Sequence, residues 1–468
     1  MNSPLYGIGF STLGKEIQLD DLPQRGNMPP WLNGTLVRTG PAKFEIGEQR
    51  YKHWFDGLAM LHKFSFKGGR LSYANQFIES KSYTEARNKG KIIRGEFGTD
   101  PCRSLFGRVA SLFFPRVTDN ANVNVSMLAG KYVAMTETRM PIVFDPETLR
   151  TVGVFDYGNE LKGQISTAHP HFDFTRKQAF NYCARLSRKS AYQVFSVARD
   201  EKNARLVGTV PIDKPAYMHS FGMSERYIVL VEFPLVVSPV ELLLSGKPFI
   251  ENYRWSPERG TRFWIVNKDG GEIVGSSEGE AFFAFHHVNA FEQEDEVVLD
   301  LVTYADPSII AAFYLDRLKS RSDLSAGQLR RFRVRIGGNH VSSEELAQEK
   351  IELPRINYRE KSTKLHRYVY GTGNRLKGNF LDQLVKIDVR DGAALTWNEE
   401  GCYPGEPVFV GSPNGTAEDE GVILSVVLDA KRGTSFLLVL DARSCEGRAR
   451  AEVPHHIPFG FHGQYFGD

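Results

Sequence analysis

Cysteine is scarce in this sequence, and its placement gives no local metal or redox motif. Cys102, Cys183, Cys402 and Cys445 are scattered over 468 residues without a CxxC pair. So few cysteines in so long a chain are typical of a reduced, cytoplasmic protein rather than of a secreted domain held by disulfides. We therefore expect neither a zinc finger nor a dithiol redox centre.

Long apolar runs and strong charge are also missing. No apolar run approaches the roughly 18 residues that a membrane-spanning helix needs, and the N-terminus lacks the pattern of a signal peptide. The net charge is only +2, and no Lys/Arg-rich run is present, which argues against a nucleic-acid partner. No convincing GxGxxG or GxxxxGK[ST] motif indicates a nucleotide cofactor.

The sequence is rich instead in short β-branched and aromatic runs that end in Gly, Asp or Asn. Such runs predict strands of antiparallel hairpins, and the clearest span residues 131–135, 226–232, 262–266, 296–302, 331–336, 383–389, 421–428 and 435–440. Together with 43 glycines they predict an all-β sandwich, barrel or propeller. A propeller of about seven four-stranded blades suits the length. No linker interrupts residues 1–468, which we expect to form a single domain.

Two segments depart from the strand pattern. Residues 102–115 place Leu and Phe at helical spacing beside two arginines, and residues 233–249 form a Pro- and Leu-rich apolar stretch. Each segment either belongs to the covered core or forms an apolar patch that enters a membrane interface.

Four of the twelve histidines lie in turn-rich or aromatic settings, each about fifty or more residues from the next. They are His169, His219, His286 and His462. A lone histidine is more often structural than a ligand, which is the interpretation we give His53, His62, His340, His366, His455 and His456. His287 follows His286 directly, so in a strand only one of the two faces inward. Pro170 separates His169 from His171, so only one of that pair need face a metal.

Four neutral imidazoles suit Fe(II), Zn(II) or Cu(II), whereas structural zinc sites prefer thiolates. Such imidazoles need an acceptor for the second ring N–H. Glu137, Glu352 and Glu406 lie in apolar strand contexts and are candidates for that role, although composition alone favours a solvated glutamate at the end of a strand for each.

Several motifs in order along the chain resemble the carotenoid cleavage oxygenase family, which includes β-carotene and apocarotenoid oxygenases, stilbene-cleaving oxygenases and a retinoid isomerohydrolase. Besides the four histidine settings, the resemblance rests on residues 32–41, 53–57, 95–99, 118–125, 136–138, 145–149 and 405–410. It implies a seven-bladed β-propeller with a short helical and loop cap that forms a substrate tunnel.

The same resemblance implies the chemistry. His169, His219, His286 and His462 would hold Fe(II), with O2 as co-substrate. Glu137, Glu352 and Glu406 would accept hydrogen bonds from His219, His286 and His462 in that order, and Val123 would lie beside an open metal position.

The expected reaction is cleavage of a carotenoid or apocarotenoid C=C bond to aldehydes, with central 15,15′ cleavage to retinal as the first choice. The alternatives are a stilbene-cleaving oxygenase, a retinyl-ester isomerohydrolase and a non-enzymatic propeller that binds apolar ligands. The resemblance also favours peripheral membrane association through residues 102–115 and 233–249, because an apolar polyene must be drawn from a bilayer.

Overall fold

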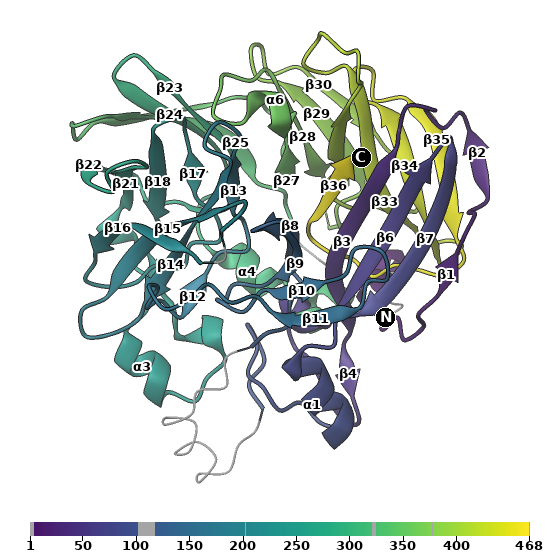
Figure 1. Ribbon diagram of the computed structural model, residues 1–468, viewed down its shortest axis with the longest axis horizontal. Coiled ribbons are helices and arrows are strands. Elements are labelled where there is room, and N and C mark those ends of the chain that lie inside the picture. The colour runs from purple at the N-terminus through teal and green to yellow at the C-terminus, as the bar shows by residue number, and fades with distance from the viewer. Residues whose placement is uncertain (1–3, 102–117, 202, 321–323, 377, 468) are drawn as a thin grey trace.

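The part of the chain that the structure describes contains seven β-sheets of four or more strands, which follow one another around a ring (Figure 1). The computed structural model describes residues 4–101, 118–201, 203–320, 324–376 and 378–467. In these residues strands dominate and helices are short. The all-β prediction is confirmed, and so is the seven-bladed propeller that the resemblance implies.

The first three blades each place their innermost strand at one end of the strand order. Blade 1 has the order β11 (Thr151–Val154), β10 (Ile142–Phe144), β9 (Lys131–Met135), β8 (Asn124–Leu128). Blade 2 has β16 (Arg205–Pro211), β15 (Ala191–Ala198), β14 (Gln178–Arg185), β12 (Ile165–Ser166), with β13 (His171–Asp173) also on β14. Blade 3 has β22 (Ile273–Gly279), β21 (Thr261–Asn267), β18 (Tyr227–Glu232), β17 (Gly222–Met223).

The next three blades repeat this arrangement. Blade 4 has the order β26 (Val341–Glu345), β25 (Gln328–Arg335), β24 (Glu296–Tyr304), β23 (Phe283–Gln293). Blade 5 has β30 (Ala394–Trp397), β29 (Gln383–Asp388), β28 (Tyr368–Gly373), β27 (Glu352–Arg355). Blade 6 has β2 (Gln24–Gly26), β35 (Gly447–Val453), β34 (Thr434–Asp441), β33 (Gly421–Asp429), β31 (Cys402–Pro404), with β32 (Val408–Gly411) also on β33.

Blade 7 closes the ring by joining segments from both ends of the sequence. Its order is β1 (Gln18–Leu19), β7 (Arg70–Phe77), β6 (Leu58–Lys67), β3 (Gly34–Lys43), β36 (Gly463–Gly467). The early strand β2 pairs with β35 of blade 6, and the late strand β36 pairs with β3. In Figure 1 the purple and yellow ribbons therefore lie side by side. The ring is closed by backbone hydrogen bonds at two places.

The eight strands predicted from the sequence are all present, with ends shifted by three residues or fewer. They are β9, β18, β21, β24, β25, β29, β33 and β34, and all lie inside a blade rather than at its rim. Sheets packed on both sides bury both faces of a strand, which is why a segment such as 227–231 in β18 is continuously apolar. β18, for example, is buried at every residue.

The hydrophobic core fills the spaces between neighbouring blades. Leu36 and Phe64 of blade 7 pack with Leu424 and Leu437 of blade 6, and the same arrangement joins blade 4 to blade 5. The innermost strands meet at the middle, where β17 contacts β23, β23 contacts β27, and β36 contacts both β32 and β8. Residues at the inner ends of different blades are thereby brought together.

Short helices and two small hairpins occupy the connections. The helices are α1 (Lys81–Lys89), α3 (Pro239–Leu244), α4 (Ser308–Ala312), α5 (Leu315–Ser320), α6 (Tyr358–Lys361) and the 3-10 turns η1 (Leu5–Phe10), η2 (Trp54–Asp56), η3 (Phe249–Asn252), η4 (Pro257–Arg259). The hairpins pair β4 (Glu45–Ile46) with β5 (Gln49–Arg50) and β19 (Leu235–Val236) with β20 (Arg254–Trp255). Among the described residues, none of the helices combines the length and apolar character needed to cross a membrane.

Of the two apolar segments that depart from the strand pattern, the structure describes only residues 233–249. Residues 102–115 lie outside the described part of the chain. In 233–249, residues 235–237 are buried in the core, whereas α3 exposes Val240, Leu243 and Leu244 at 60%, 55% and 65%. The segment therefore divides into a covered strand and an exposed apolar helix.

Ring closure depends on a glycine at the start of β36. Gly463 lies opposite Arg38 in the β3–β36 register, and a Cβ added there would lie 2.9 Å from the Val37 carbonyl oxygen and closer still to Arg38 Cγ. We predict that Gly463→Ala lowers the free energy of unfolding by about 1–3 kcal/mol, as overpacking does. Urea unfolding measures this.

Gly447→Ala is the matched control, because a Cβ at Gly447 in β35 meets no atom within 4 Å. An unchanged unfolding midpoint for Gly463→Ala would contradict the requirement for a glycine at this position of the β3–β36 pairing.

Candidate metal centre

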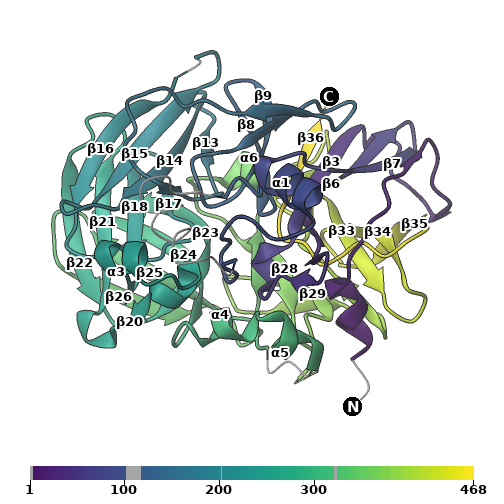
Figure 2. The same ribbon diagram turned by 90° about the horizontal axis from the view of Figure 1, so that it is seen from below.

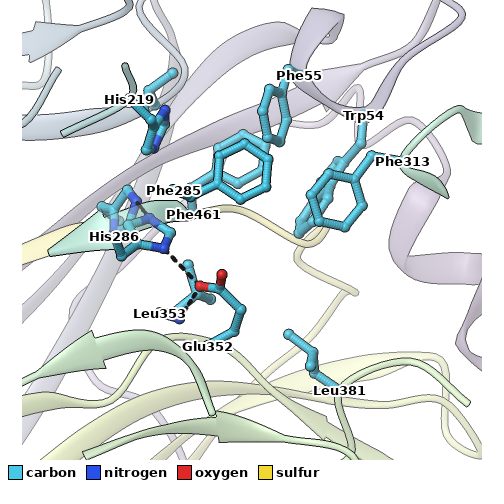
Figure 3. Close-up of a pocket in the computed structure, with 12 residues that line it drawn as sticks. Trp54, Phe55, His219, Phe285, His286, Phe313, Glu352, Leu353, Leu381 and Phe461 are labelled. Carbon is cyan, nitrogen blue, oxygen red and sulfur yellow. Dashed lines mark hydrogen bonds and ion pairs between the residues drawn. The ribbon is translucent and has the colours of Figure 1, made fainter. Parts of the chain in front are cut away.

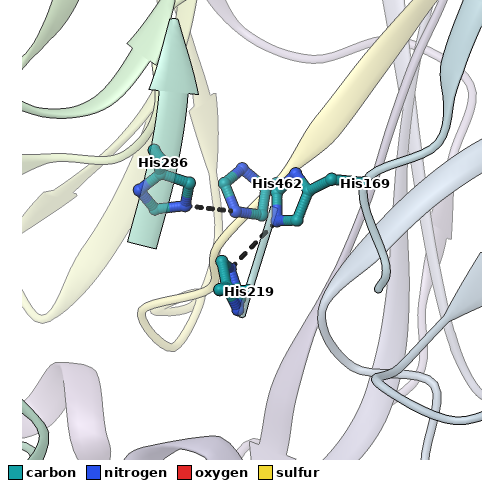
Figure 4. A group of neighbouring side chains, drawn as sticks. All are labelled: His169, His219, His286 and His462. Atoms are coloured by element: carbon teal, nitrogen blue, oxygen red, sulfur yellow. Dashed lines mark hydrogen bonds between the residues drawn. The ribbon is translucent and has the colours of Figure 1, made fainter. Parts of the chain in front are cut away.

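The inner ends of four blades bring His169, His219, His286 and His462 together at the middle of the ring (Figure 4). His169 lies between β12 and β13, His219 before β17, His286 within β23 and His462 directly before β36. One ring nitrogen from each lies within 4.8 Å of the others. The four histidines singled out in the sequence are thus adjacent in space.

The ring nitrogens meet in two close pairs. Nε2 of His169 lies 3.0 Å from Nε2 of His219, and Nε2 of His286 lies 3.1 Å from Nε2 of His462. His219, His286 and His462 are buried, while His169 is only partly buried. The Nε2 atoms therefore surround one small volume that is shielded from solvent on most sides.

Three of these imidazoles are fixed from behind by carboxylates. His219 Nδ1 lies 2.7 Å from Glu137, His286 Nδ1 lies 2.6 Å from Glu352, and His462 Nδ1 lies 2.7 Å from Glu406. These are the three pairs that the resemblance implies, in the same order. An ionised carboxylate only accepts hydrogen bonds, so each Nδ1 carries the proton and each Nε2 carries a lone pair.

The carboxylates themselves are held by groups that the sequence analysis missed. The hydroxyl of Tyr217 donates to Glu137 at 3.0 Å, and the hydroxyl of Tyr304 donates to Glu352 at 2.8 Å. Arg355 donates to both oxygens of Glu406, at 2.8 and 3.1 Å. Tyr217 lies two residues before His219, and this proximity is the only feature of the sequence that indicates a place for any of these groups near the centre.

The surroundings of Glu406 and His462 keep the glutamate ionised and the histidine neutral. Burial raises the pKa of the Glu406 carboxyl, but Arg355 and His462 outweigh burial and lower this pKa to about 2. Burial lowers the pKa of the His462 imidazole to about 4 despite the neighbouring Glu406. Glu406 is thus ionised at neutral pH and His462 is neutral, as a nitrogen ligand must be.

This donor set fits a divalent metal ion. Without a cation, the lone pairs of His286 and His462 face each other at 3.1 Å and repel, since both Nδ1 protons point to glutamates. A cation between the Nε2 atoms turns this repulsion into attraction. Neutral nitrogen donors backed by carboxylates are the arrangement that first-row divalent metals prefer.

An apolar cavity lies against one side of the histidines (Figure 3). His219, His286 and His462 line it together with Val123, whose carbonyl accepts a hydrogen bond from the His462 backbone N–H. The rest of its wall is mainly aromatic and aliphatic, from Trp54, Phe55, Phe285, Phe313, Leu353, Leu381 and Phe461. The Phe55 ring contacts those of Phe285 and Phe461, with ring centroids 6.0 and 4.9 Å away.

His171 and His287, which adjoin members of this cluster in the sequence, have partners elsewhere. His171 lies within hydrogen-bonding distance of the Tyr358 hydroxyl and the Phe221 carbonyl, both at 2.9 Å. His287 pairs with the Ser220 hydroxyl at 2.8 Å. Of the pair His169 and His171, only His169 belongs to the cluster, and of the pair His286 and His287, only His286 does.

Comparison with known proteins gives one consistent result. The sequence model of the family described as "Retinal pigment epithelial membrane protein" matches residues 10–467. The chain is 34% identical to "Carotenoid-cleaving dioxygenase, mitochondrial" of Mustela putorius furo over 97% of this chain and 95% of the relative. It is 32% identical to "Beta,beta-carotene 15,15'-dioxygenase" of Gallus gallus over 94% of each. Cobalt-substituted Synechocystis apocarotenoid oxygenase has a TM-score of 0.88 at 27% identity, covering 99% of this chain and 98% of that chain.

The carboxylate behind His286 gives a test of the metal centre. Glu352→Gln removes the charge that orients and polarises the imidazole, so we predict an affinity for Co2+ that is about 10–100-fold lower. Titration of the metal-free protein, followed by visible absorption, measures this. Glu345→Gln in β26, an exposed position, is the control. Equal affinities of the two variants would contradict a role for Glu352.

Proposed function

Since this chain belongs to the carotenoid cleavage oxygenase family, we propose that it is an Fe(II)-dependent oxygenase that cleaves a C=C bond of a carotenoid or apocarotenoid to two aldehydes. The observation that carries the proposal is the group of four imidazoles, three of which line the apolar cavity. The names of two relatives support the substrate class, since both act on carotenoids.

In this proposal His169, His219, His286 and His462 are the iron ligands. Glu137, Glu352 and Glu406 fix three of the rings through their Nδ1 protons and add negative charge behind them. Ferrous iron, when bound, supplies the one-electron chemistry that O2 needs before it reacts with a closed-shell polyene.

The remaining contribution of the protein is to position the polyene and exclude water. Val123 and Phe285 line the cavity beside the histidines, so the bond to be cleaved would lie against an apolar wall. The faces of Phe55, Phe285 and Phe461 stabilise positive charge that develops along a conjugated chain. In the balanced reaction one C=C bond and one O2 give two C=O bonds, and no external reductant is consumed.

Central 15,15′ cleavage to retinal is the first candidate among possible bonds, because a relative that matches almost the whole chain is named for it. Three alternatives can be distinguished from this reaction by experiment. They are cleavage of a stilbene, isomerisation and hydrolysis of a retinyl ester, and binding of apolar ligands without turnover.

The activity test uses purified, Fe(II)-loaded protein with β-carotene, apocarotenals, resveratrol and a retinyl ester, each under air and under nitrogen. We predict two carbonyl fragments from a carotenoid or apocarotenal under air, each carrying one atom of labelled dioxygen, and none under nitrogen. His219→Ala should abolish product formation, whereas His340→Ala, at an exposed position, should not. Mass spectrometry identifies the products and the cleaved bond.

Each contrary result points to one rival. Turnover of the ester under nitrogen would identify an isomerohydrolase, and cleavage of resveratrol alone a stilbene oxygenase. Tight carotenoid binding without bound metal or products would identify a carrier.

We further propose that the protein is cytoplasmic and associates peripherally with membranes through α3. Val240, Leu243 and Leu244 form its exposed apolar face, and the exposed Lys247 and Arg254 lie close by in the sequence. An apolar helix face beside basic residues is the pattern of an interfacial element. The partner would be a bilayer that holds the polyene substrate.

The variant Leu243→Glu should weaken binding to anionic phospholipid vesicles about tenfold or more, since burying a leucine contributes about 1.5–3 kcal/mol. Leu395→Glu in β30 replaces a leucine of similar exposure on an outer strand and is the control. Vesicle co-sedimentation measures both. Identical sedimentation of the two variants would exclude α3 as the contact.

A further inference from the structure

The histidine cluster lies between two separate cavities. His286 and His462 line the apolar cavity and also a second cavity, which we call the axial cavity. Phe313, directly after α4, belongs to the first, and Tyr358, at the start of α6, belongs to the second. Figure 2 shows α4 and α6 on opposite sides of the inner strands. The cluster is therefore approached from two sides.

The apolar cavity is a poor route for a metal ion. It encloses only about 40 Å³, and none of its lining residues is exposed. A divalent cation arrives with a tightly held water shell, and removing that shell against phenylalanine and leucine side chains costs many kcal/mol. The lining groups able to replace the lost waters are three of the histidines and Glu352 behind His286, all of which belong to the metal centre itself.

The axial cavity has the opposite character. It encloses about 350 Å³ and reaches the surface at Gly130, Phe174 and Arg199, all of which are exposed. The polar side chains of Asn124, Ser126, His171, Tyr358 and Gln464 line it. A water needs roughly 10–15 Å³ and two to four polar partners, so a hydrated ion can be accommodated along this path.

We propose that the axial cavity is the route by which a hydrated divalent metal ion enters and leaves the four-histidine centre, which leaves the apolar cavity to hydrophobic molecules. The proposal rests on the metal centre put forward above as part of the function. The proposal assigns metal passage to the axial cavity. It predicts rates of metal uptake and loss that can be measured without substrate turnover.

His169 is the ligand that an ion arriving by this route meets first. It lines the axial cavity, and it is absent from the lining of the apolar cavity. It is also the only one of the four imidazoles that is not fully buried. An ion can exchange a first water for this nitrogen and then pass to the three imidazoles held by glutamates.

The charges along the path are nearly balanced. Inside, Glu406 is paired with Arg355 at 2.8 Å. At the mouth, the exposed Arg199 adds one positive charge that opposes a cation. Reversing this charge should speed metal uptake at low ionic strength, and salt should remove the gain.

The experiment follows Co2+ uptake by metal-free protein in stopped flow, and Co2+ loss to excess EDTA, by visible absorption. Ser126→Trp narrows the axial cavity, whereas Leu381→Trp narrows the apolar cavity and is the matched control. Because a blocked passage raises the barrier equally in both directions, Ser126→Trp should slow uptake and loss by the same factor. We expect about tenfold, equivalent to about 1.4 kcal/mol, with an unchanged dissociation constant.

Two further variants do not depend on packing a tryptophan. Ser126→Cys, in a Cys102→Ser background, can be blocked with a bulky maleimide after folding, because Cys183, Cys402 and Cys445 are buried. Arg199→Glu should accelerate uptake in low salt only, while Lys247→Glu beside α3 should leave the rate unchanged.

The outcomes separate the two proposals. Failure of the parent protein to bind Co2+ would overturn the metal centre itself. Binding with rates that Ser126→Trp and the maleimide leave unchanged, or that Leu381→Trp slows equally, would overturn the axial route alone.

Discussion

The constraint on which the structure depends is the hydrogen bonding of three buried imidazoles to three carboxylates at the middle of the ring, of which Glu352 and Glu406 are buried and Glu137 is partly buried. Such charges are tolerated inside a protein only when they are fully paired. Tyr217, Tyr304 and Arg355 donate further hydrogen bonds to the glutamates, as do the backbone N–H groups of Leu353 and Gly463. Every tautomer is then fixed, and the free nitrogens converge on one point. The seven blades can be regarded as the scaffold that makes this costly arrangement stable.

The blades contribute to the centre almost one residue each. Val123 precedes β8, His169 follows β12, His219 precedes β17, and His286 lies in β23. Glu352 begins β27, Glu406 lies between β31 and β32, and His462 precedes β36. Because neighbouring blades share apolar cores, the position of each of these residues is set by packing along a whole sheet rather than by a local loop. This explains how histidines and glutamates that are far apart in the sequence lie within hydrogen-bonding distance of one another at the centre.

The sequence predicted the strands inside blades well, because β18 and β33 are apolar on both faces and end in turn residues. It predicted the histidine cluster through local settings, and the glutamate pairs through resemblance alone. The groups that hold the glutamates were not found, since a tyrosine or arginine in a strand carries no signal of its partner across blades. The division of 233–249 into the buried β19 and the exposed α3 was also unavailable, because both parts are equally apolar and only tertiary contacts distinguish them. The double closure by β2 and β36 likewise arises from long-range pairing.

The order of the blades along the chain has a consequence for biosynthesis. The fourth imidazole belongs to the strand that completes the ring, and it comes 176 residues after the third. A nascent chain emerging from the ribosome thus presents at most three of the nitrogens until residue 462 has left the exit tunnel. Three imidazoles bind a competing cation such as zinc more weakly than four do. High affinity for a metal ion therefore appears only when the ring of blades is closed. Maturation of the centre and completion of the polypeptide fold are in this sense one event.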